Sequence, residues 1–286
     1  YCPRKAFLLL SGHPPGQLHE YVQVIAAAAA KNAAKYLAEL TSTTNLAGRT
    51  IAQDIHSRAE VVVRPTLRFQ DLEACPDALL AAKQTARREN SLYYEPVVVA
   101  GTHRIDDEHR NTLYFIGYVL KQIQQTPPAR GLIITEDGVR HAVRLDAPYT
   151  SVESVVATLR GWTSSNSPPT EPGALLNGHC PYCVFRVECE ECARQADDLT
   201  LLDRMTPKLL RRYHRKGIFT ITQLSYLFRP RRFRKRPRGT SAPFNVELQA
   251  LAIRTGKIYL QQVPEIIRSN VELFLDIEGV PDRGFY

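Results

Sequence analysis

The first third of the chain mixes long amphipathic stretches with short apolar runs, and this pattern predicts both helices and strands. Residues 17–40 are rich in alanine, contain neither Pro nor Gly, and predict one long helix. The valine run at 60–65 predicts a strand, and residues 71–90 predict a helix with an interruption before its proline. Residues 91–105 are rich in β-branched and aromatic residues and predict β-structure, with Gly101 at a turn or bulge.

The middle of the chain has sharper signals. Residues 107–124 carry apolar side chains at three- and four-residue spacing, which predicts an amphipathic helix. Residues 130–146 predict a β-hairpin whose turn is Asp137-Gly138, a dipeptide that favours the backbone of a tight hairpin turn. Residues 151–162 predict another helix. Strands interleaved with helices indicate the α/β fold class.

The pattern in the last third of the chain predicts mostly helices, followed by a strand near the end. Residues 198–228 predict a helix, a turn and a second helix, with Thr220 or Thr222 as the N-cap of the second. Residues 245–260 predict a further helix followed by a strand, and the apolar run at 271–279 predicts a buried strand.

Composition limits the class of protein. The chain has 286 residues, of which 44% are hydrophobic, so it can bury a core and form roughly two domains. It has neither an apolar run long enough to span a bilayer nor the apolar segment of a signal peptide, so we expect a cytoplasmic protein without a membrane partner. In that compartment cysteines are more often metal ligands than disulfides. The abrupt ends indicate part of a longer protein.

Charge is distributed unevenly. The net charge is +8, yet residues 204–238 contain thirteen Lys or Arg and no Asp or Glu, so the remainder of the chain is net negative. A concentrated basic block on an otherwise acidic protein predicts a local binding site for a polyanion.

Four of the six cysteines lie within residues 180–192. Four thiolates so close in sequence could bind one zinc ion, although the five-residue loop in the middle is short for such a site. Alternatively, Cys180, Cys183 and Cys189 ligate an iron–sulfur cluster together with a distant fourth thiolate. Cys2 is then the expected fourth donor, because it lies in a Cys-Pro pair ahead of a basic residue and an apolar run.

The lone cysteine in "CPRKAF" and the distal "CPYCVFRVEC" resemble the signature of iron–sulfur RecB-like nucleases, which include the CRISPR-associated RecB-like exonucleases. The resemblance covers residues 1–195. It implies a PD-(D/E)XK restriction-endonuclease-like core closed by a 4Fe-4S cluster, whose ligands would be Cys2, Cys180, Cys183 and Cys189. Cys192 is then spare, or a ligand in the zinc alternative, and Cys75 is expected in the core.

PD-(D/E)XK enzymes hold Mg²⁺ with an Asp on one strand and a Glu on the next, and a Lys two residues after the Glu orients the attacking water. The resemblance makes Asp106 the candidate metal ligand for Mg²⁺- or Mn²⁺-dependent phosphodiester hydrolysis. No Glu-x-Lys strand follows it, because residues 107–124 already resemble the next helix. Either a segment is missing between Asp106 and Asp107, or the domain is a relative that does not cleave.

The stretch "RKGIFTITQL" resembles a helix-hairpin-helix module, with Gly217 at its turn. Such modules bind the DNA backbone through the N–H groups of the turn and neighbouring cations, without reading base sequence. RNA is the alternative ligand, and a plain helical hairpin with a solvated basic face is the alternative structure. The candidate nucleic-acid-binding residues are Lys208, Arg211, Arg212, Arg215, Lys216, Gly217, Arg231, Arg232, Arg234, Lys235 and Arg236.

The final apolar run ends in Asp276-x-Glu278. Side chains alternate along a strand, so both carboxylates would lie on one face and could share a divalent metal. The motif resembles the first motif of RNase H-like, DEDD-type exonucleases. An ordinary acidic strand end is the alternative.

Together these resemblances predict a metal-dependent nuclease acting on DNA, within a larger protein that also contains or contacts a helicase. The alternative is a catalytically degenerate nucleic-acid-binding subunit or scaffold of a helicase, recombination or defence complex. The predicted organisation is a RecB-like domain at 1–195, a helix-hairpin-helix-like module at 196–228, a basic linker at 229–245, and the start of an RNase H-like domain at 246–286.

Overall fold

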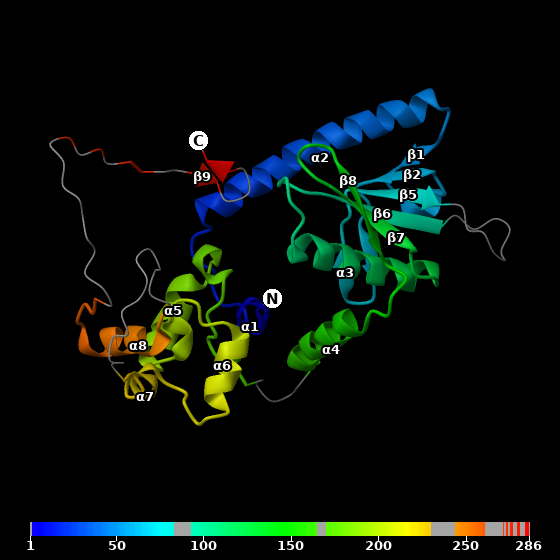
Figure 1. Ribbon diagram of the computed structural model, residues 1–286. Helices are drawn as coiled ribbons and strands as arrows, with labels where there is room; N and C mark the ends of the chain where they lie inside the picture. The colour runs from blue at the N-terminus through cyan, green and yellow to red at the C-terminus, as the bar shows by residue number, and fades with distance from the viewer. Residues whose placement is uncertain are drawn as a thin grey trace. The chain divides into compact units, whose positions relative to one another are not determined.

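The computed structural model describes residues 2–82, 93–164, 170–229 and 244–260, and, nearer the C-terminus, 271, 273, 275–276, 279–280 and 284–285. Contacts divide the chain into two units (Figure 1). The cysteine unit combines Tyr1–His19 with Pro168–Leu275, and the sheet unit combines Glu20–Ser167 with Asp276–Tyr286. The predicted RecB-like domain therefore contributes to both units. The predicted domain boundaries rest on resemblance rather than on contacts, and they stay predictions.

The sheet unit is built on one six-stranded mixed sheet, which confirms the α/β class. The order of its strands is β1-β2-β5-β6-β7-β8. The pairs β2–β5, β5–β6 and β7–β8 are antiparallel, whereas β6 and β7 are parallel and are connected through helix α3 (Asp107–Gln124), as a parallel pair requires. The strands are β1 (Ile51–Ala52), β2 (Val61–Val63), β5 (Ala78–Ala82), β6 (Tyr93–Val99), β7 (Arg130–Ile134) and β8 (Arg140–Arg144).

Helices cover both faces of this sheet (Figure 1). On one face α2 (Glu20–Leu46) packs Tyr36 and Leu37 against Val97 and Val99 of β6. On the other face α3 packs its apolar side against residues that include Tyr94 of the same strand. The even- and odd-numbered positions of β6 thus point to opposite helices, because side chains alternate along a strand. Two further helical elements in this unit are α4 (Thr150–Ser164) and the 3₁₀ turn η1 (Ile55–Ser57).

A close approach of backbones joins α2 to the end of β6. Gly101 lies in a bend just after the strand, and a Cβ atom on it would lie 2.3 Å from the carbonyl oxygen of Ile25 and 2.8 Å from the backbone nitrogen of Ala29. Any side chain at this position would therefore push α2 away from the sheet. Glycine is required here by space rather than by its backbone angles.

Most predicted elements of the sheet unit are confirmed. The helix predicted at 107–124 is α3, residue for residue, and the helices predicted at 17–40 and 151–162 are α2 and α4. The predicted hairpin is β7–β8, and Gly138 in its turn has φ +79°, a left-handed angle that glycine adopts without strain. The strands predicted within 60–65 and 91–105 are β2 and β6.

The helix predicted at 71–90 is wrong wherever the structure describes it. This stretch instead completes the β3–β4 hairpin (Leu67–Phe69 and Leu72–Ala74) and forms β5, while residues 83–90 lie outside the described residues. Leu and Ala favour helices in isolation, but β5 lies between β2 and β6 and gains hydrogen bonds from both neighbours. Ala78 and Leu79 are fully buried there, so tertiary packing overrides local preference.

The cysteine unit is helical. Its separate core gathers Leu199, Tyr213, Ile221, Leu224 and Ala250. The helix–turn–helix predicted at 198–228 is confirmed, and Thr220 caps its second helix. The elements are α1 (Pro3–Leu10), η2 (Cys180–Tyr182), α5 (Arg186–Gln195), η3 (Leu199–Leu201), α6 (Pro207–His214), α7 (Ile221–Ser225) and α8 (Val246–Thr255).

The strand predicted at the end of 245–260 does not form, and residues 271, 273, 275 and 276 of the strand predicted at 271–279 lie outside any strand, whereas Gly279 belongs to a short strand. Val271, Leu273 and Leu275 are 72–91% exposed. The described part of this apolar run is therefore not the buried strand that the sequence predicted. Near the C-terminus β9 (Gly279–Val280) and β10 (Gly284–Phe285) form a two-stranded pair. No helix in the described part of the chain is long and apolar enough to cross a membrane.

Candidate metal centre and nucleic-acid interface

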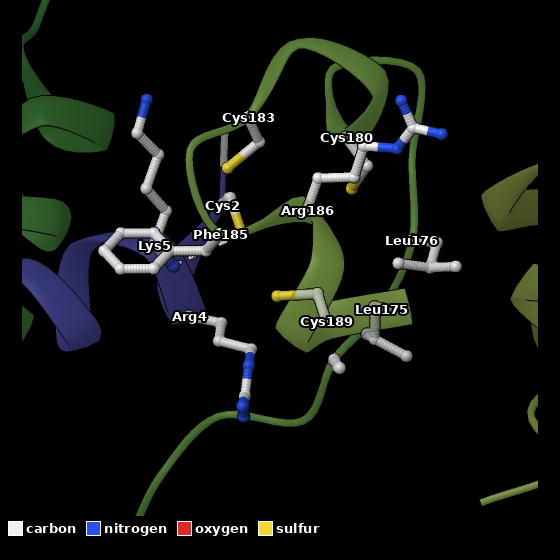
Figure 2. A pocket seen from close by; sticks show the side chains of 11 residues that line it. Cys2, Arg4, Lys5, Leu175, Leu176, Cys180, Cys183, Phe185, Arg186 and Cys189 are labelled. Atoms are coloured by element: carbon white, nitrogen blue, oxygen red, sulfur yellow. Dashed lines mark hydrogen bonds between the residues drawn. The ribbon is translucent and has the colours of Figure 1, made fainter. Parts of the chain in front are cut away.

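Four cysteines from opposite ends of the sequence line one pocket in the cysteine unit (Figure 2). They are Cys2, Cys180, Cys183 and Cys189, the same four that the sequence resemblance selects as cluster ligands. The pocket is partly open, and its cavity volume is about 20 Å³. The structure thus brings Cys2 next to residues almost two hundred positions further along the chain.

Local structure holds each sulfur in place. Cys2 is the N-cap of α1, where Pro3 occupies the first helical position and the Sγ atom accepts a hydrogen bond of 3.4 Å from the Lys5 N–H. Cys180 opens the η2 turn, and its Sγ atom accepts a hydrogen bond of 3.3 Å from the Asn177 N–H. Cys183 closes that turn, and Cys189 is buried on α5. Backbone N–H groups that donate to sulfur stabilise a thiolate.

The four thiols influence one another electrostatically. Burial raises the pKa of the Cys180 thiol above its ordinary value, and the nearby Cys2 and Cys183 raise it further. Burial also raises the pKa of Cys189, which Arg4 opposes through a hydrogen bond and its positive charge. A metal binds the thiolate form, so its binding would release the protons of these thiols.

The donor set can be compared with the two metal centres expected from the sequence. Among the described residues, no group of three or more His, Cys, Asp or Glu side chains converges closely enough to hold a metal ion. Four thiolates on one zinc ion, with Zn–S bonds of about 2.3 Å, would lie within about 4 Å of one another. A 4Fe-4S cluster takes one thiolate for each of its four irons and needs a wider space. The four cysteines that line the pocket equal in number the thiolates that such a cluster takes, and the choice between the two centres stays a prediction.

The two remaining cysteines lie outside the pocket lining. The Sγ atom of Cys192 accepts a hydrogen bond of 3.7 Å from Arg4, so the residue contacts the pocket wall without facing its space. Cys75 is exposed in the sheet unit, and its expected place in the core is therefore wrong. It follows β4 at a strand end rather than lying on the buried side of a helix.

Asp106 serves as a helix cap. Its side chain, 62% exposed, accepts a hydrogen bond from the His109 N–H at the start of α3, and the Asp106 N–H donates one to His109 Nδ1. Partial burial works against its charge, but the His109 N–H and imidazole outweigh that effect and lower the pKa of Asp106. The catalytic role of Asp106 stays a prediction.

Sequence reasoning missed a second carboxylate, Asp77, because it lies in the stretch predicted as helix. Asp77 immediately precedes β5, and its Oδ2 atom accepts a hydrogen bond of 2.7 Å from the Val99 N–H on β6. Burial raises its pKa. Val97 and Val99 are its neighbours on β6, so the adjacent strand supplies no second carboxylate beside it. Glu95, further along β6, is paired with Arg130 at 2.9 Å.

The predicted acidic pair at the C-terminus is only partly described. Asp276 is exposed and lies outside any strand, and Glu278 falls outside the described residues. Their shared metal site stays a prediction.

The helical hairpin presents a basic surface. Thr206 caps α6, Gly217 turns the chain with φ +74°, and Thr220 caps α7 through a capping box. The five described candidate cations lie on α6 and the turn; all are exposed, and none has an ion-pair partner within the described chain: Lys208, Arg211, Arg212, Arg215 and Lys216. The remaining five candidates, Arg231, Arg232, Arg234, Lys235 and Arg236, lie outside the described residues.

Comparison with known proteins does not assign the chain to a family. No family model matches the chain, and no curated protein gives a significant match.

Proposed function

We propose that this chain binds nucleic acid, preferentially DNA, through the α6–α7 hairpin, and that the sheet unit does not itself cleave it. The main observation behind this proposal is the cluster of exposed cations on α6 and the turn that follows it. None of these cations is paired with an acid in the described chain. Unpaired surface cations release counterions when they meet phosphate, which drives binding. The backbone N–H groups of Lys216, Gly217 and Ile218 are bonded within the turn, so the proposal rests on the side-chain cations.

The pocket cysteines support a second part of the proposal, a 4Fe-4S cluster held by Cys2, Cys180, Cys183 and Cys189. Such a cluster would supply a covalent link between the two sequence segments of the cysteine unit. The residues of this chain hold it: α1 presents one thiolate, and the η2–α5 segment presents three. Its role would be structural, because the resemblance implies a cluster that closes the domain.

The strand pair β5–β6 supports a RecB-like origin without RecB-like catalysis. The resemblance places an Asp on one strand and a Glu-x-Lys on the next, and Asp77 lies at the start of β5 beside β6. On β6, Asp77 is hydrogen-bonded to the backbone N–H of Val99, which therefore occupies the position expected for the Glu. Gly101, two residues later, occupies the position expected for the Lys. A valine cannot bind a metal, and a glycine cannot orient a water, so the pair lacks two of three required groups.

A second candidate function is Mg²⁺- or Mn²⁺-dependent cleavage of DNA. The buried carboxylate of Asp77 favours it, because a carboxylate with a raised pKa at a strand end is a common feature of catalytic sites. In this case Asp77, Asp106 or Asp276 would contact the metal. A helicase or recombination partner would then supply the metal-binding Glu and the water-orienting Lys that the sheet unit lacks.

One set of experiments separates the two functions. Fluorescence anisotropy with labelled single-stranded and duplex DNA, over a series of salt concentrations, measures binding by the wild type. The double variant Arg211→Gln/Arg215→Gln should bind more weakly, and the slope of log K against log salt should become shallower by about 1.8 on duplex DNA. The matched control is Arg144→Gln/Arg194→Gln, which removes two exposed arginines that are paired with Asp146 and Glu190.

The same protein, incubated with DNA and Mn²⁺ or Mg²⁺, should leave the DNA intact. Cleavage that disappears in Asp77→Ala or Asp106→Ala would overturn the non-cleaving proposal and favour the second candidate. Cleavage that disappears only in Asp276→Ala would assign it to the C-terminal motif. Equal binding by the hairpin variant and its control would overturn the hairpin as the binding site.

A further inference from the structure

Arg4 is the only buried cation among the described residues, and it lies at the cysteine pocket. Its side chain is 9% exposed, and it belongs to the first turn of α1, two residues after Cys2. It lines the same pocket as the four cysteines (Figure 2). A buried charge is costly unless it is paired, so its partners identify what the residue does.

Arg4 connects three segments of the cysteine unit. Its guanidinium forms an ion pair with Glu171 and a second with Glu188, where the Nη2–Oε1 distance is 3.1 Å. It also donates a hydrogen bond of 3.1 Å to the carbonyl oxygen of Pro172. The planar guanidinium can serve all these acceptors at once, whereas the ammonium of a lysine could not reach them in the same geometry.

The remaining contacts of Arg4 are with sulfur. Its Nη2 donates to Cys192 Sγ at 3.7 Å, and its side chain also donates to Cys189, whose thiolate it favours. The Nε–H is buried and has no hydrogen-bond partner among the described residues. A buried donor at the wall of an otherwise thiol-lined pocket points to an acceptor inside that pocket. The sulfur atoms of an anionic cluster are acceptors of this kind.

We propose that Arg4 is a positioning residue of the cluster site, which offsets the negative charge of the cluster and donates N–H groups to its cysteine sulfurs. The inference rests on the proposed cluster. Hydrogen bonds to sulfur and nearby positive charge raise the reduction potential of such clusters and slow their loss.

The carboxylates of Glu171 and Glu188 limit this effect, because each forms an ion pair with the guanidinium and offsets part of its positive charge. Removing one of these carboxylates should raise the midpoint potential of the cluster, whereas removing Arg4 should lower it. This opposition distinguishes an electrostatic role from a purely structural one, since a loss of packing would weaken the site in either variant.

The test uses the full chain, purified and reconstituted without oxygen. Iron content, the midpoint potential from an EPR-monitored titration, and the rate of cluster loss in air are measured for each variant. Arg4→Met removes the charge and all donors, Arg4→Lys keeps the charge, and Glu188→Gln removes a partner. The control is Glu191→Gln, on the same helix, whose carboxylate pairs with Arg194 at 3.6 Å.

We expect Arg4→Met to lower the midpoint potential and to lose its cluster about tenfold faster, the range typical of groups that orient metal ligands. Arg4→Lys should keep a potential close to that of the wild type, and Glu188→Gln should raise it. Unchanged potentials in Arg4→Met and Glu188→Gln would overturn the role of Arg4.

If Arg4→Met retains no cluster, the proposal is judged on the other two variants. A raised potential in Glu188→Gln with a near wild-type one in Arg4→Lys supports it, and any other combination overturns it. A wild-type protein without iron would refute the proposed cluster itself. This outcome is seen in the wild type alone, so it is distinguishable from a failure of the Arg4 proposal, which appears only in the variants.

Discussion

The backbone N–H of Val99 donates a hydrogen bond of 2.7 Å to Asp77 Oδ2, so a carboxylate closes the antiparallel ladder at the start of β5. The bond gives Asp77 a structural role, since Val99 is buried and its N–H needs an acceptor. Asp77 is thus engaged with the backbone of β6, whose nearest positions, Val97 and Val99, carry no carboxylate.

Asp77→Ala should destabilise the sheet unit by about 1–3 kcal/mol, because it leaves the Val99 N–H without its acceptor. Urea denaturation followed by circular dichroism measures the change. Asp77→Asn keeps an acceptor oxygen and removes the partly buried charge, so it should not show this loss at neutral pH. Equal losses in both variants would show that the charge, rather than the hydrogen bond, matters.

The same carboxylate predicts a pH dependence. Burial raises the pKa of Asp77 in the folded protein, so the folded state binds more protons than the unfolded state between the two pKa values. The contribution of Asp77 to stability should therefore fall as pH rises through that window. At pH 7 we expect Asp77→Asn to melt at a higher temperature than the wild type, with the gap closing as pH falls below the ordinary pKa of an aspartate.

Asp106→Ala should cost about 1 kcal/mol, the typical price of losing an N-cap at a helix as well defined as α3. Because the pKa of Asp106 is lowered on folding, its contribution is present above the unfolded pKa and is lost as pH falls through the folded one. Thermal melting at pH 7 and at pH 3 would measure this. The neighbouring Asp107→Ala is the control, as its side chain is 79% exposed and makes only a 3.4 Å contact with Arg110.

Gly101→Ala should destabilise the sheet unit by about 1–3 kcal/mol through overpacking against α2. The matched substitution Gly161→Ala lies on α4, where a new Cβ would meet nothing within 4 Å. That variant should be stabilised by about 0.5–1 kcal/mol, because alanine is the better helix former. A Gly101→Ala protein as stable as Gly161→Ala would contradict the close approach of α2.

Serine variants of the cysteines should fall into two groups. Cys2→Ser, Cys180→Ser, Cys183→Ser and Cys189→Ser should each lose iron, because each removes one of four proposed ligands. Cys192→Ser should retain it, and exposed Cys75→Ser is the control. Iron and zinc content per chain measures the result. Loss of zinc in the Cys180, Cys183, Cys189 and Cys192 variants, with retention in the Cys2 and Cys75 variants, would instead support the zinc alternative.

The sequence predicted the sheet unit well where two local signals agreed. Helix α3 combines an amphipathic pattern with an acidic cap, and the β7–β8 hairpin combines alternating strands with an Asp-Gly turn. It failed at β5, where Leu and Ala suit a helix and only the neighbouring strands decide otherwise. The wrong prediction of a helix over 71–90 also explains why Asp77 was overlooked. Within a helix, Asp77 could not be recognised as a residue at the start of a strand.

For the site, spacing identified the four cysteines of the pocket, since three lie close in sequence and Cys2 follows a recognisable pattern. Arg4 was missed, because nothing in "CPRK" distinguishes a buried arginine from the exposed lysine beside it. Burial depends on the carboxylates of Glu171 and Glu188, which are separated from it by most of the chain.

The division of the cysteine unit between two sequence segments sets the order in which it can form. Arg4 and Glu188 are 184 residues apart, and ribosomes add about 5–20 residues per second, so α1 leaves the ribosome roughly 10–40 s before its partner exists. The sheet unit is synthesised within that interval and can fold first. The N-terminal helix then has to wait, with its thiol open to oxidation, until the last cysteines emerge.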